Sequence, residues 1–172
     1  MGSSISPLPK SPLVDANLLF DFLAWRFSTE ADPPIPEPNL QRLSNPQLKK
    51  AFGWYLDLAK PIQTSPHVIA EIQGLAKSRL GWYGERLASF WRFAQRELAR
   101  LRLQEDLIRI VDMDRNDLPP FGPTDTSLLA LAARSDSLVL TDEGGLRGRC
   151  YEKQIKVWGS SEILAEWQNR LA

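Results

Sequence analysis

The stretch that decides the fold is residues 121–146, FGPTDTSLLALAARSDSLVLTDEGGL. Its leucine spacing predicts a helix that begins near Pro123. Residues 137–141 form a short apolar run before a pair of glycines, which is typical of a buried parallel strand entering a turn. One carboxylate, Asp125, therefore stands at a helix start, and another, Asp142, at the C-terminal end of a strand. In open parallel sheets, ligands bind outside those strand ends.

Asp125 has two interpretations. Leu128, Leu129 and Ala132 follow it at helical spacing and place it in line with an apolar stripe, where an unpaired acid is costly. An acid in the first turn of a helix is also an ordinary capping residue. Residues 121–146 alone do not decide whether Asp125 is a functional-site acid or a helix-capping acid.

Composition limits the classes of function. The chain has 172 residues, is 43% hydrophobic and carries no net charge, which fits one globular domain without a global attraction to nucleic acid or membrane. A single cysteine, Cys150, excludes an internal disulfide and a cysteine metal cluster, and a single histidine, His67, argues against a histidine site. No run is apolar enough for a membrane span and no secretion signal is evident, so we expect a cytoplasmic protein.

We expect a loose leader at 1–12 and one domain over 13–172, interrupted by a proline-rich loop at 30–46. A cap residue before proline marks two helix starts, at Asn45-Pro46 and at Ser65-Pro66.

Short apolar runs predict strands at 13–19, where the strand leads into a helix, at 107–111, at 137–141 and at 155–158. A last helix should start at Ser160 or Ser161, with apolar residues through Leu171 facing inward. Because strands alternate with helices, the predicted class is α/β: an α/β/α sandwich around a short, mainly parallel sheet of four to five strands.

Two further acids lie where apolar residues are expected. Asp15 ends the first strand within LVDANLL, so a site is favoured over a turn residue. Glu71 falls on the stripe that joins Val68 and Leu75, although a glutamate there can also reach solvent or pair with an arginine. By contrast, we expect the acids between 112 and 117 to be solvated loop residues.

Basic residues gather just before these loop acids. Residues 77–102 hold seven Lys or Arg against two Glu. Within the helix expected over 81–103, Arg92, Arg96 and Arg100 recur every four residues, which suggests a stripe that contacts RNA phosphates. A solvated face, balanced by acids elsewhere, is the alternative.

Four acids and no softer ligands indicate an oxygen-only site, which suits Mg²⁺ or Mn²⁺. Such ions commonly activate water and bind phosphate oxygens. Gly144-Gly145 would let a polymer backbone approach. The chain has no GxxxxGK[ST] loop, which excludes P-loop nucleotide hydrolysis.

In this order and at these separations, LVDANLL, SPHVIAEI, GPTDTSLLALA and LVLTDEGGL resemble the PIN domain, a family of metal-dependent ribonucleases that includes many toxins of toxin–antitoxin pairs. The resemblance covers most of 13–170. It implies that the metal-binding and catalytic acids are Asp15, Glu71, Asp125 and Asp142. It also implies that Asn17 and Thr141 orient water or ligands.

The implied protein is a Mg²⁺- or Mn²⁺-dependent endoribonuclease acting on single-stranded RNA, with an antitoxin protein as a candidate partner and a homodimer as a candidate assembly. The alternatives are a PIN-fold module that binds RNA or protein without cutting, and a small-molecule phosphatase. Two departures from the family stand out. The segment 28–60 is longer than in compact members, and Glu143 follows Asp142, where it could replace that acid as a ligand or be a bystander.

Overall fold

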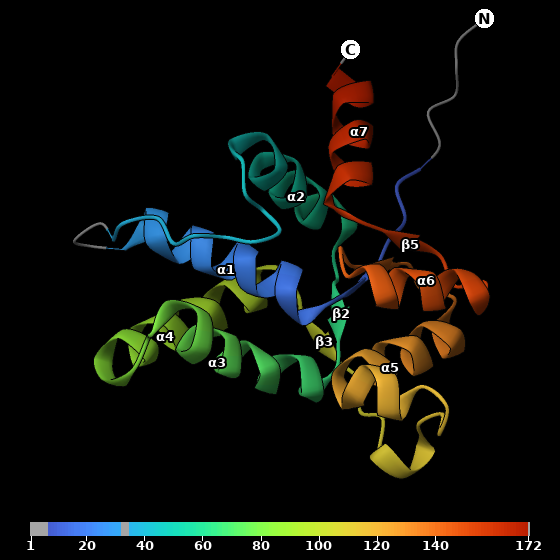
Figure 1. The fold of residues 1–172 in the computed structure, drawn as a ribbon. Coiled ribbons are helices and arrows are strands. Elements are labelled where there is room, and N and C mark those ends of the chain that lie inside the picture. The colour runs from blue at the N-terminus through green and yellow to red at the C-terminus, as the bar shows by residue number, and fades with distance from the viewer. Residues whose placement is uncertain (1–6, 32–34, 172) are drawn as a thin grey trace, which may run out of the picture.

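The computed structural model describes residues 7–31 and 35–171. Five two-residue strands form one parallel sheet in the order β3-β2-β1-β4-β5 (Figure 1). The strands are β1 (Leu13–Val14), β2 (Gln63–Thr64), β3 (Gln104–Glu105), β4 (Val139–Leu140) and β5 (Val157–Trp158). Helices flank this sheet, which confirms the predicted α/β/α class.

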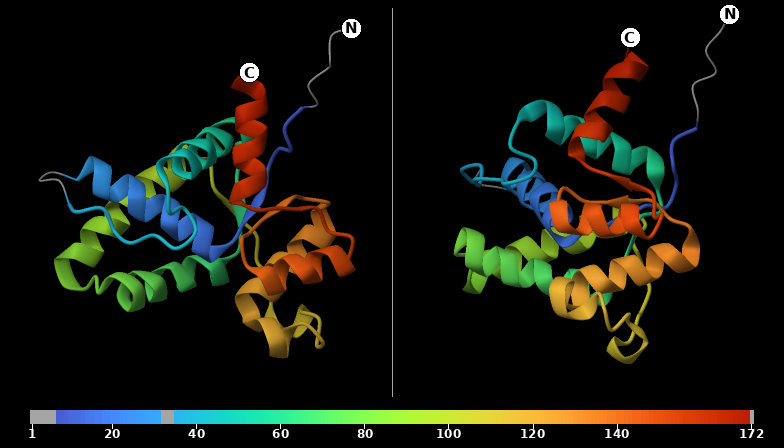
Figure 2. Two further views of the ribbon diagram at one scale, coloured as in Figure 1. Left: turned by 45° about the horizontal axis from the view of Figure 1, so that its top comes forward. Right: turned by 45° about the vertical axis from the view of Figure 1, so that its right-hand side comes forward.

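The helices are α1 (Ala16–Glu30), α2 (Pro46–Ala59), α3 (Pro66–Leu80), α4 (Gly84–Arg100), α5 (Leu118–Ser135), α6 (Gly144–Glu152) and α7 (Ser160–Leu171), with a 3₁₀ turn at Ile110–Asp112. Both predicted caps are confirmed, because Asn45 and Ser65 each accept a hydrogen bond from the backbone N–H three residues on. Helix α1 runs between α2 on one side and α3 and α4 on the other, while α2 also packs on α7 (Figure 2).

The core lies around β1, β4 and the inner face of α1. Both residues of β1 and both of β4 have no exposed surface, and Phe20 and Leu23 of α1 are equally buried. Since burial of each large side chain contributes about 1.5–3 kcal/mol, this centre fixes where the two strands end.

The strand order sets the position of the site. From β1 the chain builds β2 and β3 on one side, then crosses to add β4 and β5 on the other. The order therefore reverses between β1 and β4, and such a switch point leaves a crevice at the carboxyl ends of those strands. Asp15 directly follows β1, and Thr141, Asp142 and Glu143 directly follow β4.

Two sequence predictions are wrong, and one strand was not predicted. The run 107–111 is not a strand: Leu107, Ile110 and Val111 are 65%, 55% and 81% exposed, and the edge strand β3 lies at Gln104–Glu105. The sequence also gave no signal for β2, because its two residues are polar. Leu171, expected to face inward, is 68% exposed.

Residues 7–12 are also not a loose leader. The Tyr55 hydroxyl donates to the carbonyl of Pro9, Ser11 N–H donates to the carbonyl of Ala59, and Gln63 N–H donates to the carbonyl of Pro12. The rest of the predicted leader, residues 1–6, and the prolines at 33 and 34 lie outside the described residues. The loop prediction holds for 31 and 35–45, although α1 still includes Glu30 and α2 already includes Pro46.

Candidate active site

A cleft of about 460 Å³ opens at the carboxyl ends of the strands, where α3, α5 and α6 meet the start of α1. Asn17, Glu71, Asp125 and Glu143 line it, together with the turn around Gly122. A second hollow of about 450 Å³ shares Phe121 and Gly145 with the cleft and continues along α6. The two hollows are therefore neighbours, and we call them together the groove.

Asp15 lies at the buried end of this site. Its Oδ1 accepts the Leu18 N–H at 2.7 Å, so the residue caps α1, and its side chain is 3% exposed. Burial raises the pKa of Asp15 to about 6, and the nearby Asp142 raises it further. The Leu18 N–H and the Thr141 hydroxyl oppose this by hydrogen-bonding the carboxylate.

Asp125 carries the most perturbed acid group of the cleft. Burial raises its pKa to about 7, and the charges of Asp15, Glu71 and Glu143 add to that effect. The charges of three other carboxylates thus reach Asp125. Asp125 lies in the first turn after the kink at Gly122, where the helix dipole favours an acid, but no backbone N–H of the described residues donates a hydrogen bond to its carboxylate.

Glu71 reaches the cleft from the first two turns of α3. Val68, Ile72 and Ala76 form the buried side of that helix, and Glu71 is half-buried at its margin. No cation forms an ion pair with Glu71 within the described chain, which removes the alternative of an arginine partner there.

The structure places Asp142 and Glu143 differently. Asp142 does not line the cleft, although its charge reaches Asp15, and its Oδ1 accepts the Ser160 N–H at 2.8 Å, at the start of α7. A side chain at position 159 would collide with this carboxylate, so Gly159 leaves room for it. Glu143 lines the cleft in its place and contributes to the raised pKa of Asp125.

Thr141 and Asn17 lie where the sequence placed them, beside the acids. The fully buried Thr141 hydroxyl accepts the Glu143 N–H at 3.0 Å, so its own proton is available to Asp15. Asn17, the second residue of α1, lines the cleft. Thr141 thereby connects the acids that follow β1 and β4.

Two important residues, Asp21 and Arg42, were missed from the sequence. Asp21 has no exposed surface; its Oδ2 accepts the backbone N–H of Arg42 and Leu43, and its Oδ1 pairs with Arg79 at 2.9 Å. The Arg42 guanidinium in turn bonds Glu143 at 2.7 Å. The only available signal was an acid amid the apolar residues of α1; nothing local marks Arg42.

The loop acids were also misjudged in part. Asp117 is 1% exposed rather than solvated, because Arg149 and Lys153 form ion pairs with it across the gap between α5 and α6. Asp112 and Asp114 are exposed, as expected.

The donor chemistry of the cleft fits a hard cation, since its acids offer only carboxylate oxygens. The arrangement is nevertheless open: among residues 7–31 and 35–171, no three acidic, histidine or cysteine side chains stand close enough to hold one metal ion. His67, remote from this chemistry, hydrogen-bonds the carbonyl of Ile108.

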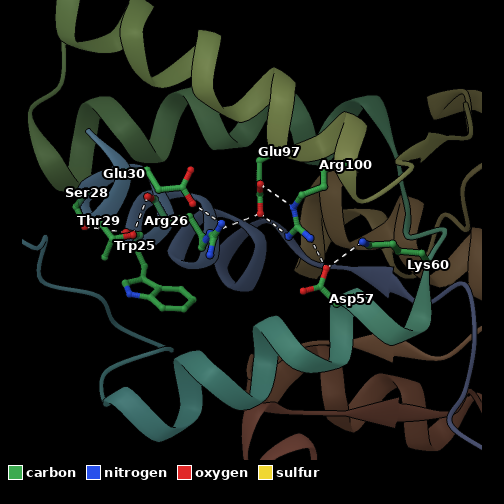
Figure 3. A network of polar contacts seen from close by, with 9 residues as sticks. All are labelled: Trp25, Arg26, Ser28, Thr29, Glu30, Asp57, Lys60, Glu97 and Arg100. Atoms are coloured by element: carbon green, nitrogen blue, oxygen red, sulfur yellow. Dashed lines mark hydrogen bonds and ion pairs between the residues drawn. The ribbon is translucent and has the colours of Figure 1, made fainter. Parts of the chain in front are cut away.

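The predicted arginine stripe is divided. Arg100 is held by Glu97 and Asp57 in a network that joins α4 to α2, and Glu97 also faces Arg26 of α1 (Figure 3). Glu97 is only 5% exposed, so Arg100 neutralises a buried charge. We therefore assign Arg100 to structure rather than to RNA binding.

Arg92 and Arg96 lie elsewhere on α4. They border a hollow of about 400 Å³ between α1 and α4, which Phe27 and Phe93 also line. Arg92 pairs with Glu85 at 2.5 Å, and both side chains are largely exposed. These two arginines remain candidates for phosphate contact.

No protein-family model, curated protein or solved structure matches this chain. The resemblance to the PIN domain therefore rests on the four sequence motifs alone. Within the described residues, no helix has the length and apolar character needed to cross a membrane.

Proposed function

We propose that the protein is a Mg²⁺- or Mn²⁺-dependent endoribonuclease with a PIN-like fold. The observation that carries the proposal is the set of four carboxylates, Asp15, Glu71, Asp125 and Glu143, which come from separate elements at one switch-point cleft. Burial raises the pKa of Asp125 to about 7, and the charges of the other three carboxylates add to this effect. Unbalanced acids destabilise a fold, and a divalent cation is the ligand that would relieve them.

The residues of the cleft have different roles in this proposal. Asp15, Glu71, Asp125 and Glu143 would hold the ion, which requires the open cluster to draw together. A bound divalent cation supplies a water of lowered pKa and offsets charge on a phosphate. Thr141 fixes the Asp15 carboxylate, and Asn17 presents an amide to the cleft that can orient a phosphate oxygen or a water.

A polymer substrate is supported by the groove. It continues from the cleft past Phe121 along α6, where added Cβ atoms at Gly144 and Gly148 would meet nothing within 4 Å. A chain of nucleotides can therefore approach the backbone closely. The choice of RNA over DNA comes from the resemblance to the PIN domain.

The test is cleavage of a fluorescent single-stranded RNA in Mn²⁺ and in EDTA. We expect cleavage in Mn²⁺ alone, and Asp125→Asn to lower its rate at least ~100-fold, as loss of a charge-stabilising group commonly does. Asp136→Asn is the matched control, because Asp136 is an exposed acid at the opposite end of α5 and asparagine tolerates its left-handed backbone.

Equal rates for Asp125→Asn and the wild-type protein would exclude this site as the source of activity. RNA binding without cleavage would support the binding module instead. Release of phosphate from small phosphomonoesters would support a phosphatase.

A further inference from the structure

The loop between α1 and α2 places one cation over the acidic cleft. Arg42 Nη2 bonds Glu143 Oε2 at 2.7 Å, and the charge of Arg42 also lowers the pKa of Asp15. No other Lys or Arg of the described chain forms an ion pair with Asp15, Glu71, Asp125 or Glu143. Arg42 thus partly balances the cluster when no metal is present.

The position of Arg42 is built into the fold. Asp21 accepts the N–H of Arg42 at 2.6 Å and of Leu43 at 3.1 Å, and Arg79 pairs with Asp21 from α3. Leu40 and Leu43 on either side are buried in the core. Because these anchors are backbone hydrogen bonds and apolar neighbours, the Arg42 side chain can move without releasing the loop.

The two ion pairs in this chain of contacts differ in strength. Arg79 and Asp21 are 12% and 0% exposed, so their pair is buried and persistent, whereas Arg42 and Glu143 are 31% and 46% exposed. An ion pair between such exposed side chains contributes little to stability and exchanges readily. The backbone of the loop is therefore fixed, while the Arg42 guanidinium can exchange Glu143 for another partner.

We propose that Arg42 is an exchangeable counter-ion: it holds Glu143 in the metal-free protein, gives up that carboxylate to a divalent cation, and then binds a phosphate of the RNA. This inference rests on the proposed function. A guanidinium suits both partners, because its planar donors pair with carboxylate and phosphate alike. No bond is made or broken; only ionic partners change.

The first experiment measures Mn²⁺ affinity by calorimetry on the full chain. We expect Arg42→Gln to bind Mn²⁺ about 3- to 10-fold more tightly than wild type, since a competing positive charge beside the site is gone. In a Glu143→Gln background, Arg42→Gln should change the affinity much less. Lys156→Gln is the matched control, because Lys156 also forms one ion pair but precedes β5, at the amino ends of the strands and so at the opposite end of the sheet from the cleft.

The second experiment measures binding of single-stranded RNA with Ca²⁺ in place of Mn²⁺ as a function of salt. Arg42→Gln should lower the logarithmic salt slope by ~0.7, the contribution of one phosphate contact on a single strand, and Arg42→Lys should keep it. The Arg42→Lys variant tests whether the charge alone is needed, and circular dichroism shows whether each variant is still folded.

Each outcome decides between the two proposals. Unchanged Mn²⁺ affinity in Arg42→Gln, with the wild type binding Mn²⁺, overturns the counter-ion and leaves the proposed function standing. An unchanged salt slope overturns the transfer to phosphate. No Mn²⁺ binding by the wild type overturns the proposed function itself.

Discussion

At the scale of single residues, neighbouring acids take different roles because of strand geometry. Successive side chains leaving an extended strand point in opposite directions. Asp142 therefore reaches the start of α7, while Glu143, one residue later, reaches the cleft. The sequence pair Asp-Glu left this choice open, and only the position of Ser160 after β5 decides it.

The raised pKa of Asp125 predicts how the metal-free protein responds to pH. Its pKa of about 7 exceeds the ~3.9 of an unfolded aspartate, so the folded state binds the proton more tightly between those values. The free energy of unfolding should then fall as pH rises from about 4 to about 7, and stay low above. Asp15, with a folded pKa of about 6, acts in the same direction.

Urea unfolding in EDTA at pH 5 and at pH 8 measures this dependence of the free energy of unfolding on pH. We expect the wild type to be more stable at pH 5 and the difference to shrink in Asp125→Asn, which has no charge to bury. Glu71→Gln should also reduce the difference in stability between pH 5 and pH 8, because it removes a charge that raises the pKa of Asp125. If stability differs between pH 5 and pH 8 as much in Asp125→Asn as in the control Asp136→Asn, the pH dependence does not come from Asp125.

At the scale of elements, a kink positions Asp125. Helix α5 is interrupted at Gly122, whose φ of 72° and ψ of 177° only glycine adopts readily, and the second part starts at Pro123 as predicted. The turn lines the cleft, so it sets the direction from which Asp125 enters.

Gly122→Ala should cost roughly 1–3 kcal/mol of stability and lower Mn²⁺-dependent cleavage, because the new residue is strained there. Its Cβ would meet nothing within 4 Å, so backbone strain is the only cause. Gly74→Ala, also without a Cβ contact but in the middle of α3, should instead stabilise by roughly 0.5–1 kcal/mol. Denaturant midpoints of the two variants should therefore move in opposite directions.

Helix geometry explains the divided arginine stripe of α4. Each residue turns the helix by about 100°, so a four-residue spacing overshoots one turn by about 40° and an eight-residue spacing by about 80°. Arg100 therefore points well away from Arg92. It meets Asp57 of α2, whereas Arg92 and Arg96 border the hollow beside α1.

At the scale of the whole molecule, charged side chains have two different roles. The network of Arg26, Glu97, Arg100 and Asp57 ties α1, α4 and α2 together (Figure 3). Arg96, by contrast, forms no ion pair within the described residues. The first group should matter for stability, and Arg96 for binding.

Arg100→Gln should lower stability by roughly 1–2 kcal/mol, because Glu97 would stay buried with only Arg26 nearby, and should leave the salt slope of RNA binding unchanged. Arg96→Gln should leave stability within about 0.5 kcal/mol and lower that slope by ~0.7. Thermal melts and salt titrations of both variants measure the contrast. If Arg96→Gln leaves the slope unchanged, α4 does not contact the RNA backbone.

Much of this protein could be predicted from local sequence. Apolar periodicity and cap residues predicted most helices, the strand before Asp15 and the strand before Asp142, because burial and capping act over a few residues. The same patterns marked Asp15, Glu71 and Asp125 as acids in apolar surroundings. These determinants are short-range, so they can be recognised without the fold.

Tertiary structure alone decided the rest. The polar strand β2 exists because β1 and β3 hydrogen-bond to it, not because of its own residues. Arg42 reaches Glu143 across 101 positions of sequence, and Arg100 reaches Asp57 across 43. Such pairs depend on how helices pack around the sheet, and a residue's chemistry does not specify which distant partner it will meet.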